Sequence, residues 1–225
     1  MTDMATDRKP AAQLPEDFKR MVDDFFSVQC RYQAAIRQVQ TKLEILDDEF
    51  QMRHQRNPIH HMQSRMKSIQ SITEKLRRKQ AELTIESAVA NLTDIAGVRV
   101  ICSYVQDVYA VANLLTCQDD VHLVRCRDYI QTPKENGYRS LHLIIEVPVF
   151  LKEGRVMVPV EVQIRTIAMD FWASLEHSLR YKAIGAVPEE ISAQLKQTAL
   201  DIEALDQRMQ SIHDRVEALS NGNDA

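Results

Sequence analysis

Two stretches decide the fold of this 225-residue chain: Asp94-Ile-Ala-Gly-Val-Arg-Val-Ile-Cys102 and Val158-Pro-Val-Glu-Val-Gln-Ile-Arg-Thr166. Successive side chains of a strand point to opposite faces, so the second stretch places its three valines and its isoleucine on one face. Glu161, Gln163 and Arg165 share the other face. Burying such polar groups is costly unless they meet partners. An edge strand with its polar face in water would explain this stretch alone, but the acid of the first stretch favours a functional site.

Asp94 and Glu161 are the acids of these two predicted strands. Asp94 lies where the first strand begins, and Glu161 lies inside the second. Two carboxylates from adjacent strands are a recurrent arrangement for a divalent cation shared with a phosphate, and Mg²⁺ prefers such oxygen ligands. The alternative is that Asp94 caps a turn and Glu161 pairs with an arginine. We predict a Mg²⁺ site at Asp94 and Glu161.

Composition argues against several classes of protein. The net charge of −4 disfavours a generally basic nucleic-acid-binding surface, although a local basic patch is compatible with it. No apolar run approaches the roughly 20 residues that span a bilayer, and the N-terminus lacks the apolar segment of a signal peptide. The four cysteines form no C-x-x-C pair, which predicts free thiols in a cytoplasmic protein. Glycine-rich phosphate-binding motifs are absent, so we expect side chains to hold any phosphate.

The order of predicted elements indicates a mixed sheet covered by helices. Residues 1–13 are polar and expected to be disordered. A helical pattern of one or two helices begins at Pro15 and ends before Asn57-Pro58. After an extended segment, Ser68 caps a helix that carries Leu83 on its apolar side. Strands are predicted at 98–104, 121–126, 141–148 and 156–166, and helices at 105–115 and 169–182. The apolar side of the helix at 169–182 is predicted to consist of Phe171, Trp172, Leu175 and Leu179.

One domain is expected over residues 14–187, followed by a last helix over 188–220. Pro188-Glu-Glu begins that helix, and its apolar residues recur near heptad spacing. Such a stripe packs either on the N-terminal helix or on another subunit. Residues 221–225 are predicted to be a tail.

Two groups of side chains suit a nucleotide. The four cations at positions 75, 77, 78 and 79, which follow those at 65 and 67, either form a solvated face or flank a polyphosphate. Tyr138 follows the turn at Asn136-Gly137, where the chain re-enters a strand. Cations beside it, among them Lys134, suit stacking on a nucleobase whose phosphates they hold; the alternative is a surface tyrosine that covers the strand end. His142 is more often a hydrogen-bonded structural histidine than a proton carrier.

Five motifs stand in order along the chain: Arg65-Met-Lys67-Ser68, Asp94-Ile-Ala-Gly-Val-Arg99, Pro133-Lys-Glu-Asn-Gly-Tyr138-Arg-Ser-Leu-His142, Glu161-Val-Gln-Ile-Arg-Thr166 and Phe171-Trp-Ala-Ser-Leu-Glu-His177. In this order they resemble the synthetase domain of the RelA/SpoT family, over residues 15–219. With helices on both sides and no other domain, the chain resembles the small alarmone synthetases of that family.

The resemblance implies an α+β fold, a nucleotidyltransferase-like mixed β-sheet flanked by helices with N- and C-terminal helical extensions. It implies an enzyme of the stringent response that transfers pyrophosphate from ATP to the 3′-hydroxyl of GDP or GTP, yielding (p)ppGpp and AMP, and often a homotetramer. Asp94 and Glu161 would bind Mg²⁺ and act in catalysis, with Glu161 also placed to activate the 3′-hydroxyl. ATP would be bound by Arg65, Lys67, Ser68, Lys75, Arg78 and Arg99, of which the arginines at 65 and 99 would enclose adenine. GDP or GTP would be bound by Arg127, Lys134, Tyr138, His142, Gln163 and Asp170, with Tyr138 stacked on guanine.

Two positions depart from the family pattern. Asp170 stands where the family motif Met-Asn-Phe-Trp has asparagine, and its carboxylate could accept hydrogen bonds from guanine N1 and N2. The segment His61-Met-Gln63 differs from the branch that pppGpp activates. Alternative functions are a single-stranded RNA-binding oligomer, a helical interaction protein with a vestigial nucleotide site, and a synthetase acting on adenosine nucleotides. The acid pair argues against the vestigial site, and the negative net charge argues against RNA binding as the main role.

Overall fold

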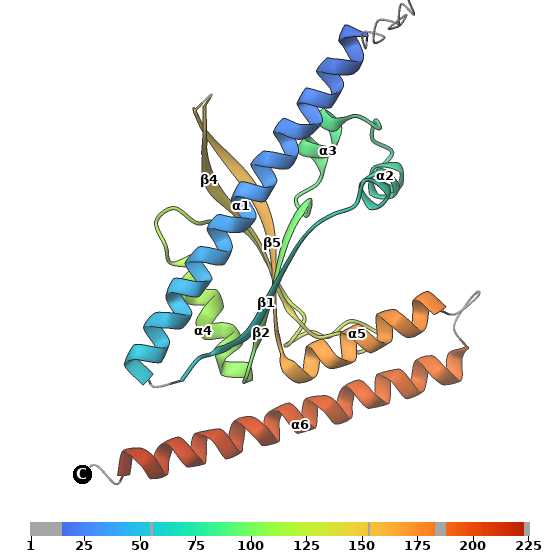
Figure 1. Ribbon diagram of the computed structural model, residues 1–225. Coiled ribbons are helices and arrows are strands. Elements are labelled where there is room, and N and C mark those ends of the chain that lie inside the picture. The colour runs from blue at the N-terminus through green and yellow to red at the C-terminus, as the bar shows by residue number, and fades with distance from the viewer. Residues whose placement is uncertain (1–14, 55, 153, 183–187, 223–225) are drawn as a thin grey trace, which may run out of the picture.

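A five-stranded sheet lies at the centre of the computed structural model, which describes residues 15–54, 56–152, 154–182 and 188–222 (Figure 1). Its strand order is β1-β2-β5-β4-β3. β2 and β5 are parallel, and the other neighbours are antiparallel, so the predicted mixed sheet is confirmed. The elements are α1 (Glu16–His54), β1 (Ile59–Met66), α2 (Ile69–Arg78), α3 (Ile85–Asn91), β2 (Ala96–Cys102), α4 (Val105–Thr116), β3 (His122–Asp128), β4 (Leu141–Leu151), β5 (Gly154–Thr166), α5 (Ile167–Lys182) and α6 (Glu189–Gly222).

The main core lies between one face of the sheet and the helices α1 and α4. The alternating apolar residues of β5, at positions 158, 160, 162 and 164, are at most 1% exposed, as their spacing predicts. α1 is one continuous helix of 39 residues, because its apolar residues keep helical spacing and no glycine or proline interrupts it. The helix ends at His54, shortly before Asn57-Pro58. The ring of a proline disfavours helical backbone angles in the residue that precedes it, here Asn57.

α5 and α6 form a second layer beside the sheet (Figure 1). Trp172 of α5 is buried, and its ring N–H donates to the backbone oxygen of Leu195 at 3.0 Å. Thr166, at the end of β5, donates its hydroxyl to Asp206 of α6 at 2.8 Å. The predicted apolar side of α5 is therefore wrong in part: Trp172 and its neighbours face α6, whereas the other three members are about half exposed, namely Phe171, Leu175 and Leu179.

Other predictions need correction at their ends. The extended segment before Ser68 is a full strand, β1, and Ser68 caps α2 as expected. Leu83 does not belong to that helix: α2 ends at Arg78, and Leu83 is 54% exposed. α6 extends to Gly222 and packs chiefly on α4 and α5 rather than on α1. The predicted tail at 221–225 is wrong for residues 221 and 222, which belong to α6. Its remainder and the predicted tail at 1–13 lie outside the described residues.

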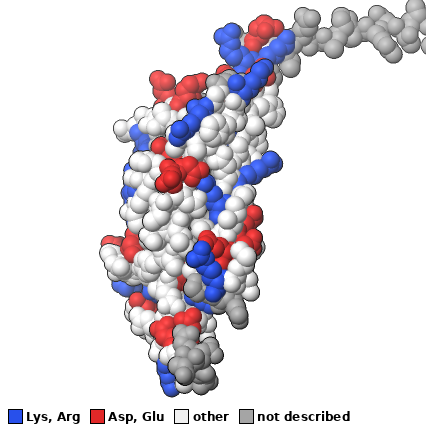
Figure 2. All heavy atoms as spheres, turned by 90° about the vertical axis from the view of Figure 1, so that its left-hand side faces the viewer, with Lys and Arg blue, Asp and Glu red and all other residues white. Residues whose placement is uncertain are grey.

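The charges on one side of the molecule are mixed in sign. Figure 2 shows lysines and arginines interspersed with aspartates and glutamates on that side, and no continuous basic surface. A surface of this kind does not favour a polyanion along its length. Within the described residues, no helix combines the length and the apolar character needed to cross a membrane.

Gly137 holds the loop before β4 against α6. Its φ is +90°, and a Cβ atom there would lie 2.5 Å from the Cβ of Ala199. Gly154 has a φ of +120° but nothing within 4 Å of the position of an added Cβ atom.

We expect Gly154→Ala to lower the free energy of unfolding by about 1 kcal/mol through backbone strain. Gly137→Ala should lower it by about 1–3 kcal/mol more through overpacking. Urea denaturation of both variants measures this, and equal losses would contradict the packing argument.

Candidate active site

Strand register brings the predicted site residues onto one face of the sheet. Gly97 of β2 pairs with Arg65 of β1 on one side and with Glu161 of β5 on the other. Directly paired residues point to the same face, so these side chains lie opposite the core. Glycine leaves the row open between Arg65 and Glu161, and a cavity of about 230 Å³ lies there. The next row across the sheet consists of Gln63, Arg99, Gln163, His142 and Arg127.

Asp94 lies just before β2 and forms ion pairs with two lysines. Its Oδ2 atom accepts hydrogen bonds from Lys67, which follows β1, and from Lys75 of α2, the latter at 2.6 Å. Burial raises the pKa of Asp94, but the hydrogen bonds and charges of the two lysines outweigh it and hold that pKa below its usual value. The carboxylate is therefore ionised, and it holds two ammonium groups beside the sheet.

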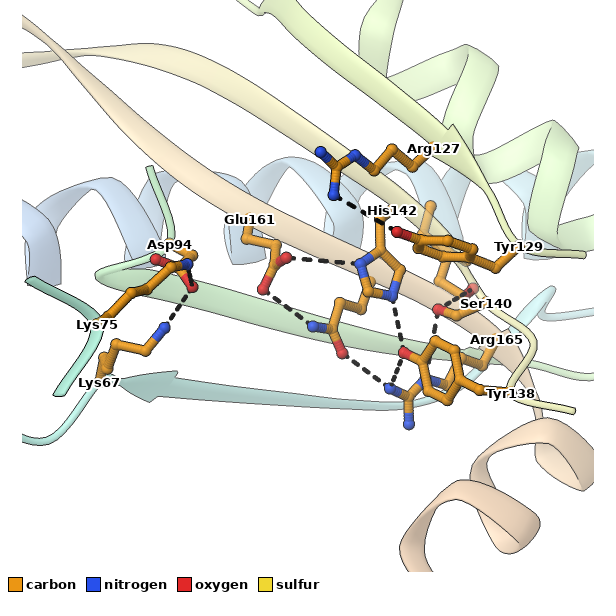
Figure 3. A network of polar contacts seen from close by, with 12 residues as sticks. Lys67, Lys75, Asp94, Arg127, Tyr129, Tyr138, Ser140, His142, Glu161 and Arg165 are labelled. Atoms are coloured by element: carbon orange, nitrogen blue, oxygen red, sulfur yellow. Dashed lines mark hydrogen bonds and ion pairs between the residues drawn. The ribbon is translucent and has the colours of Figure 1, made fainter. Parts of the chain in front are cut away.

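Glu161 lies between this ion-paired group and a cluster of aromatic side chains (Figure 3). Its Oε2 atom accepts a hydrogen bond from Gln163 at 2.9 Å, and its Oε1 atom lies 3.5 Å from Nδ1 of His142. Burial raises the pKa of Glu161, whereas His142 and Gln163 lower it to a value below the usual range. The negative charge of Asp94 also raises this pKa, so the two acids act on each other electrostatically.

The two acids fit a Mg²⁺ ion that arrives with a phosphate ligand. The Oδ1 atom of Asp94 is buried and has no hydrogen-bond partner among the described residues. The same residues contain no cluster of three or more metal-ligating side chains. Mg²⁺ commonly uses one or two carboxylates and completes its shell with phosphates and water. Asp94 and Glu161 could hold such an ion, whereas an all-protein metal cage is not built here.

Five polar side chains form a closed network on the face of the sheet opposite the core: Glu161, His142, Tyr138, Arg165 and Gln163 (Figure 3). Arg165 donates to the hydroxyl of Tyr138 at 2.5 Å and to Oε1 of Gln163 at 2.9 Å. The hydroxyl of Tyr138 lies 2.7 Å from Nε2 of His142. Because that hydroxyl accepts from Arg165, it can donate to Nε2, which places the ring proton of a neutral His142 on Nδ1, toward Glu161.

A cluster of aromatic rings, formed by Tyr129, Tyr138 and His142, adjoins this network. The ring of Tyr129 meets His142 edge to face, with centroids 5.1 Å apart, and its centroid lies 6.0 Å from that of Tyr138. The ammonium of Lys134 lies 4.7 Å and 4.6 Å from the centroids of the Tyr129 and Tyr138 rings. Arg127 is exposed beside the Tyr129 hydroxyl, at 3.5 Å. The sequence analysis did not select Tyr129, although an aromatic residue directly after a strand was a signal for it.

Not every predicted site residue joins these groups. The hydroxyl of Ser68 caps α2 by accepting from the backbone N–H of Ser71 at 3.2 Å. Arg78 is the last residue of α2, its side chain is exposed, and it makes no ion pair with Asp94. Asp170 lies between two arginines, with its Oδ1 atom 3.1 Å from Arg165 and 3.6 Å from Arg99. Strand alternation places Arg165 on the site face, but the sequence analysis gave it no role.

A protein-family model described as "Region found in RelA / SpoT proteins" matches residues 64–186. This chain belongs to the RelA/SpoT family. It is 46% identical to the GTP pyrophosphokinase YwaC of Bacillus subtilis (strain 168) over 202 residues. The aligned region covers 90% of this chain and 96% of YwaC.

Solved structures agree with this assignment. The chain is similar to the crystal structure of small alarmone synthetase 2 from Bacillus subtilis, with a TM-score of 0.78 and 45% identity over 85% of this chain and 99% of that chain. It is also similar to the crystal structure of small alarmone synthetase 1 from Bacillus subtilis bound to its product pppGpp, with a TM-score of 0.77 and 34% identity. That match covers 90% of this chain and 99% of that chain. The predicted resemblance to small alarmone synthetases and the predicted α+β class are confirmed.

The ion pair between Lys67 and Asp94 should be visible as an energetic coupling. We expect Asp94→Asn and Lys67→Met each to lower the free energy of unfolding. The double variant should lose about 1–2 kcal/mol less than the sum, because water reaches only 18% and 13% of the two side chains. Urea denaturation of the four proteins gives the coupling. Lys79→Met is the control, since Lys79 donates to the backbone oxygen of Asn91 and not to Asp94. The loss of unfolding free energy in Lys79→Met should therefore add to the loss in Asp94→Asn. Additivity in both cycles would contradict the ion pair.

Proposed function

We propose that this protein transfers the β,γ-pyrophosphate of ATP to the 3′-hydroxyl of GDP or GTP and releases AMP. One observation carries the proposal: Glu161 lies between two lysines that pair with Asp94 and a cluster of aromatic rings (Figure 3). A transfer between two nucleotides needs a place for a triphosphate, a place for a base, and a carboxylate between them. A related protein named GTP pyrophosphokinase and a related structure with pppGpp support this substrate class. The homotetramer and the cytoplasmic location stay predictions.

The ATP side of the site is proposed to consist of Arg65, Arg99, Lys67 and Lys75. The two arginines lie on neighbouring strands in adjacent rows, and guanidinium planes stack well on a base. The two lysines neutralise Asp94 while no phosphate is bound. A triphosphate offers them stronger anionic partners, so they would exchange the carboxylate for phosphate oxygens. Ser68 and Arg78 remain predicted ATP contacts.

The acceptor side is proposed to bind guanosine nucleotides on Tyr138. Lys134 and Arg165 both lie near its ring, at 4.6 Å and 5.0 Å from the centroid. Lys134 is exposed whereas Arg165 is buried, so an incoming base would displace Lys134. Its ammonium would then be available for the phosphates, together with Arg127. His142 and Gln163 would hold the nucleotide beside Glu161, and Asp170 lies at the same end of the site.

Alignment and charge neutralisation would account for most of the rate. The low pKa of Glu161 keeps it ionised, which makes it a weak base but a good hydrogen-bond acceptor for the 3′-hydroxyl. Its orientation is fixed by Gln163 and His142. Asp94 and Glu161 are the proposed Mg²⁺ ligands; a bound Mg²⁺ would neutralise phosphate charge and polarise the hydroxyl.

Loss of either acid should abolish synthesis. We expect purified protein with ATP, GDP and Mg²⁺ to form ppGpp and AMP, and Glu161→Gln or Asp94→Asn to reduce kcat by at least about 100-fold. Nucleotide chromatography measures both products. Asp120→Asn is the matched control, because Asp120 accepts from Lys42 in an ion pair outside the site. Unchanged product formation in both acid variants would refute the assignment of these residues.

The acceptor assay separates guanosine from adenosine chemistry. GDP, GTP, GMP and ADP are each supplied with ATP, and the pyrophosphorylated product is identified by mass. We expect GDP and GTP to be converted far faster than ADP, because a site that hydrogen-bonds one base edge leaves its polar groups unpaired with another. Equal rates with ADP would favour the synthetase of adenosine nucleotides that the sequence left open.

A further inference from the structure

Arg165 is a buried arginine, and most of its hydrogen-bond partners are residues of the candidate site. Its side chain comes from β5 and is only 5% exposed. Its guanidinium donates to the hydroxyl of Tyr138, to Gln163 and, at 3.3 Å, to the hydroxyl of Ser140. It also donates to Asp170 of α5 at 3.1 Å. A charge buried at this depth needs partners on every side, and here those partners include the tyrosine proposed to stack on the acceptor base.

Asp170 continues this chain of contacts toward the ATP side. The same Oδ1 atom that accepts from Arg165 lies 3.6 Å from Nη1 of Arg99. Arg65, Arg99 and Arg165 crowd one region of the sheet face: burial and the charges of the other two arginines lower the pKa of Arg99, whereas Asp170 raises it. Asp170 is therefore the counter-ion that holds Arg99 and Arg165 in fixed positions.

We propose that Arg165 and Asp170 are positioning residues that couple the ATP side to the acceptor side. The path runs from Arg99 through Asp170 and Arg165 to Tyr138 and Gln163. An adenine ring on Arg99 fixes that guanidinium against Asp170, which fixes Arg165 and with it Tyr138. The ordering is then complete before the second nucleotide binds, so each nucleotide tightens the binding of the other.

The coupling gives Asp170 a role different from base recognition alone. A carboxylate that only accepted from guanine would affect the acceptor. A carboxylate that also holds Arg99 affects ATP as well, although it lies on α5 and no contact joins it to Lys67 or Lys75 among the described residues. The proposal rests on the proposed function for the identity of the two nucleotides, but the coupling itself is a statement about binding.

Binding is measured first, by calorimetric titration with GDP and with a non-hydrolysable ATP analogue, each alone and in the presence of the other. In wild-type protein we expect the analogue to tighten GDP binding by about fivefold or more. Asp170→Asn keeps the shape of the side chain but removes its charge, so this factor should fall toward one. Independent binding in the wild type, or an undiminished factor in Asp170→Asn, would overturn the coupling.

Steady-state kinetics supply the second readout. We expect Asp170→Asn to raise KM for ATP and KM for GDP together, each by roughly tenfold, the effect of losing one charge-assisted hydrogen bond. A change confined to KM for GDP would make Asp170 a base-binding residue only and would overturn the proposal. Wild-type protein that binds both nucleotides but forms no ppGpp would refute the proposed function instead, and the binding experiment would still decide the coupling.

A double-mutant cycle tests whether Arg165 carries the effect. Tyr138→Phe keeps the ring but removes the hydroxyl that Arg165 binds. Tyr138 and Asp170 both contact Arg165. Together, Tyr138→Phe and Asp170→Asn should therefore weaken the coupling between the two nucleotides by less than the sum of their separate effects. Arg165→Lys should abolish the effect of Asp170→Asn, and the Tyr138 cycle decides the matter if Arg165→Lys does not fold. Arg56→Lys is the control: Arg56 pairs with buried Asp107 outside the site, so its loss should lower stability and leave the coupling unchanged. Additive effects would overturn the proposal.

Discussion

The parallel pairing of β2 with β5 is the constraint on which the site depends. It sets Gly97 opposite Glu161 and Arg99 opposite Gln163, while the alternate residues of both strands fill the core beneath α1. Side chains alternate with a period of two, so a slip of one residue would turn Glu161 into the core and a valine toward the site. The buried valines therefore fix which side chains face the candidate site as firmly as they fix the fold. Gly97 adds the open space, because any side chain there would enter the cavity.

Most charged side chains of the site are balanced by oppositely charged side chains. Asp94 is paired with Lys67 and Lys75, and Asp170 is paired with Arg165 beside Arg99. Leaving such charges unpaired at this burial would cost several kcal/mol, of the order measured for broken buried pairs. The arrangement therefore stabilises the buried charges, and in the proposed function phosphates would replace Asp94 as partners of the two lysines. Glu161 differs, because its partners are the neutral Gln163 and a histidine, which leaves its negative charge available.

Local periodicity was sufficient for the features that depend on one element. It predicted the two faces of β5 and the continuous apolar stripe of α1. The Mg²⁺ site at Asp94 and Glu161 stays a prediction. Periodicity failed on α5, where a helical period allows two overlapping stripes, one through Phe171 and Leu175 and one through Trp172. The predicted apolar side combined both stripes, whereas the packing of α6 buries only the stripe of Trp172. Which stripe is buried depends on contacts such as that with Leu195, 23 residues after Trp172, which no local pattern contains.

The role of Arg165 was hidden from the sequence for a similar reason. Alternation placed it beside Glu161 and Gln163, but its meaning comes from partners on α5 and on the loop before β4. A transfer between two bound nucleotides gains most when both are oriented at once, since alignment supplies much of the rate. A buried guanidinium with a planar fork of donors suits this task, because it fixes several acceptors in one geometry. If the site worked as two independent pockets, a surface lysine at each would serve as well, and burying an arginine between them would bring no advantage.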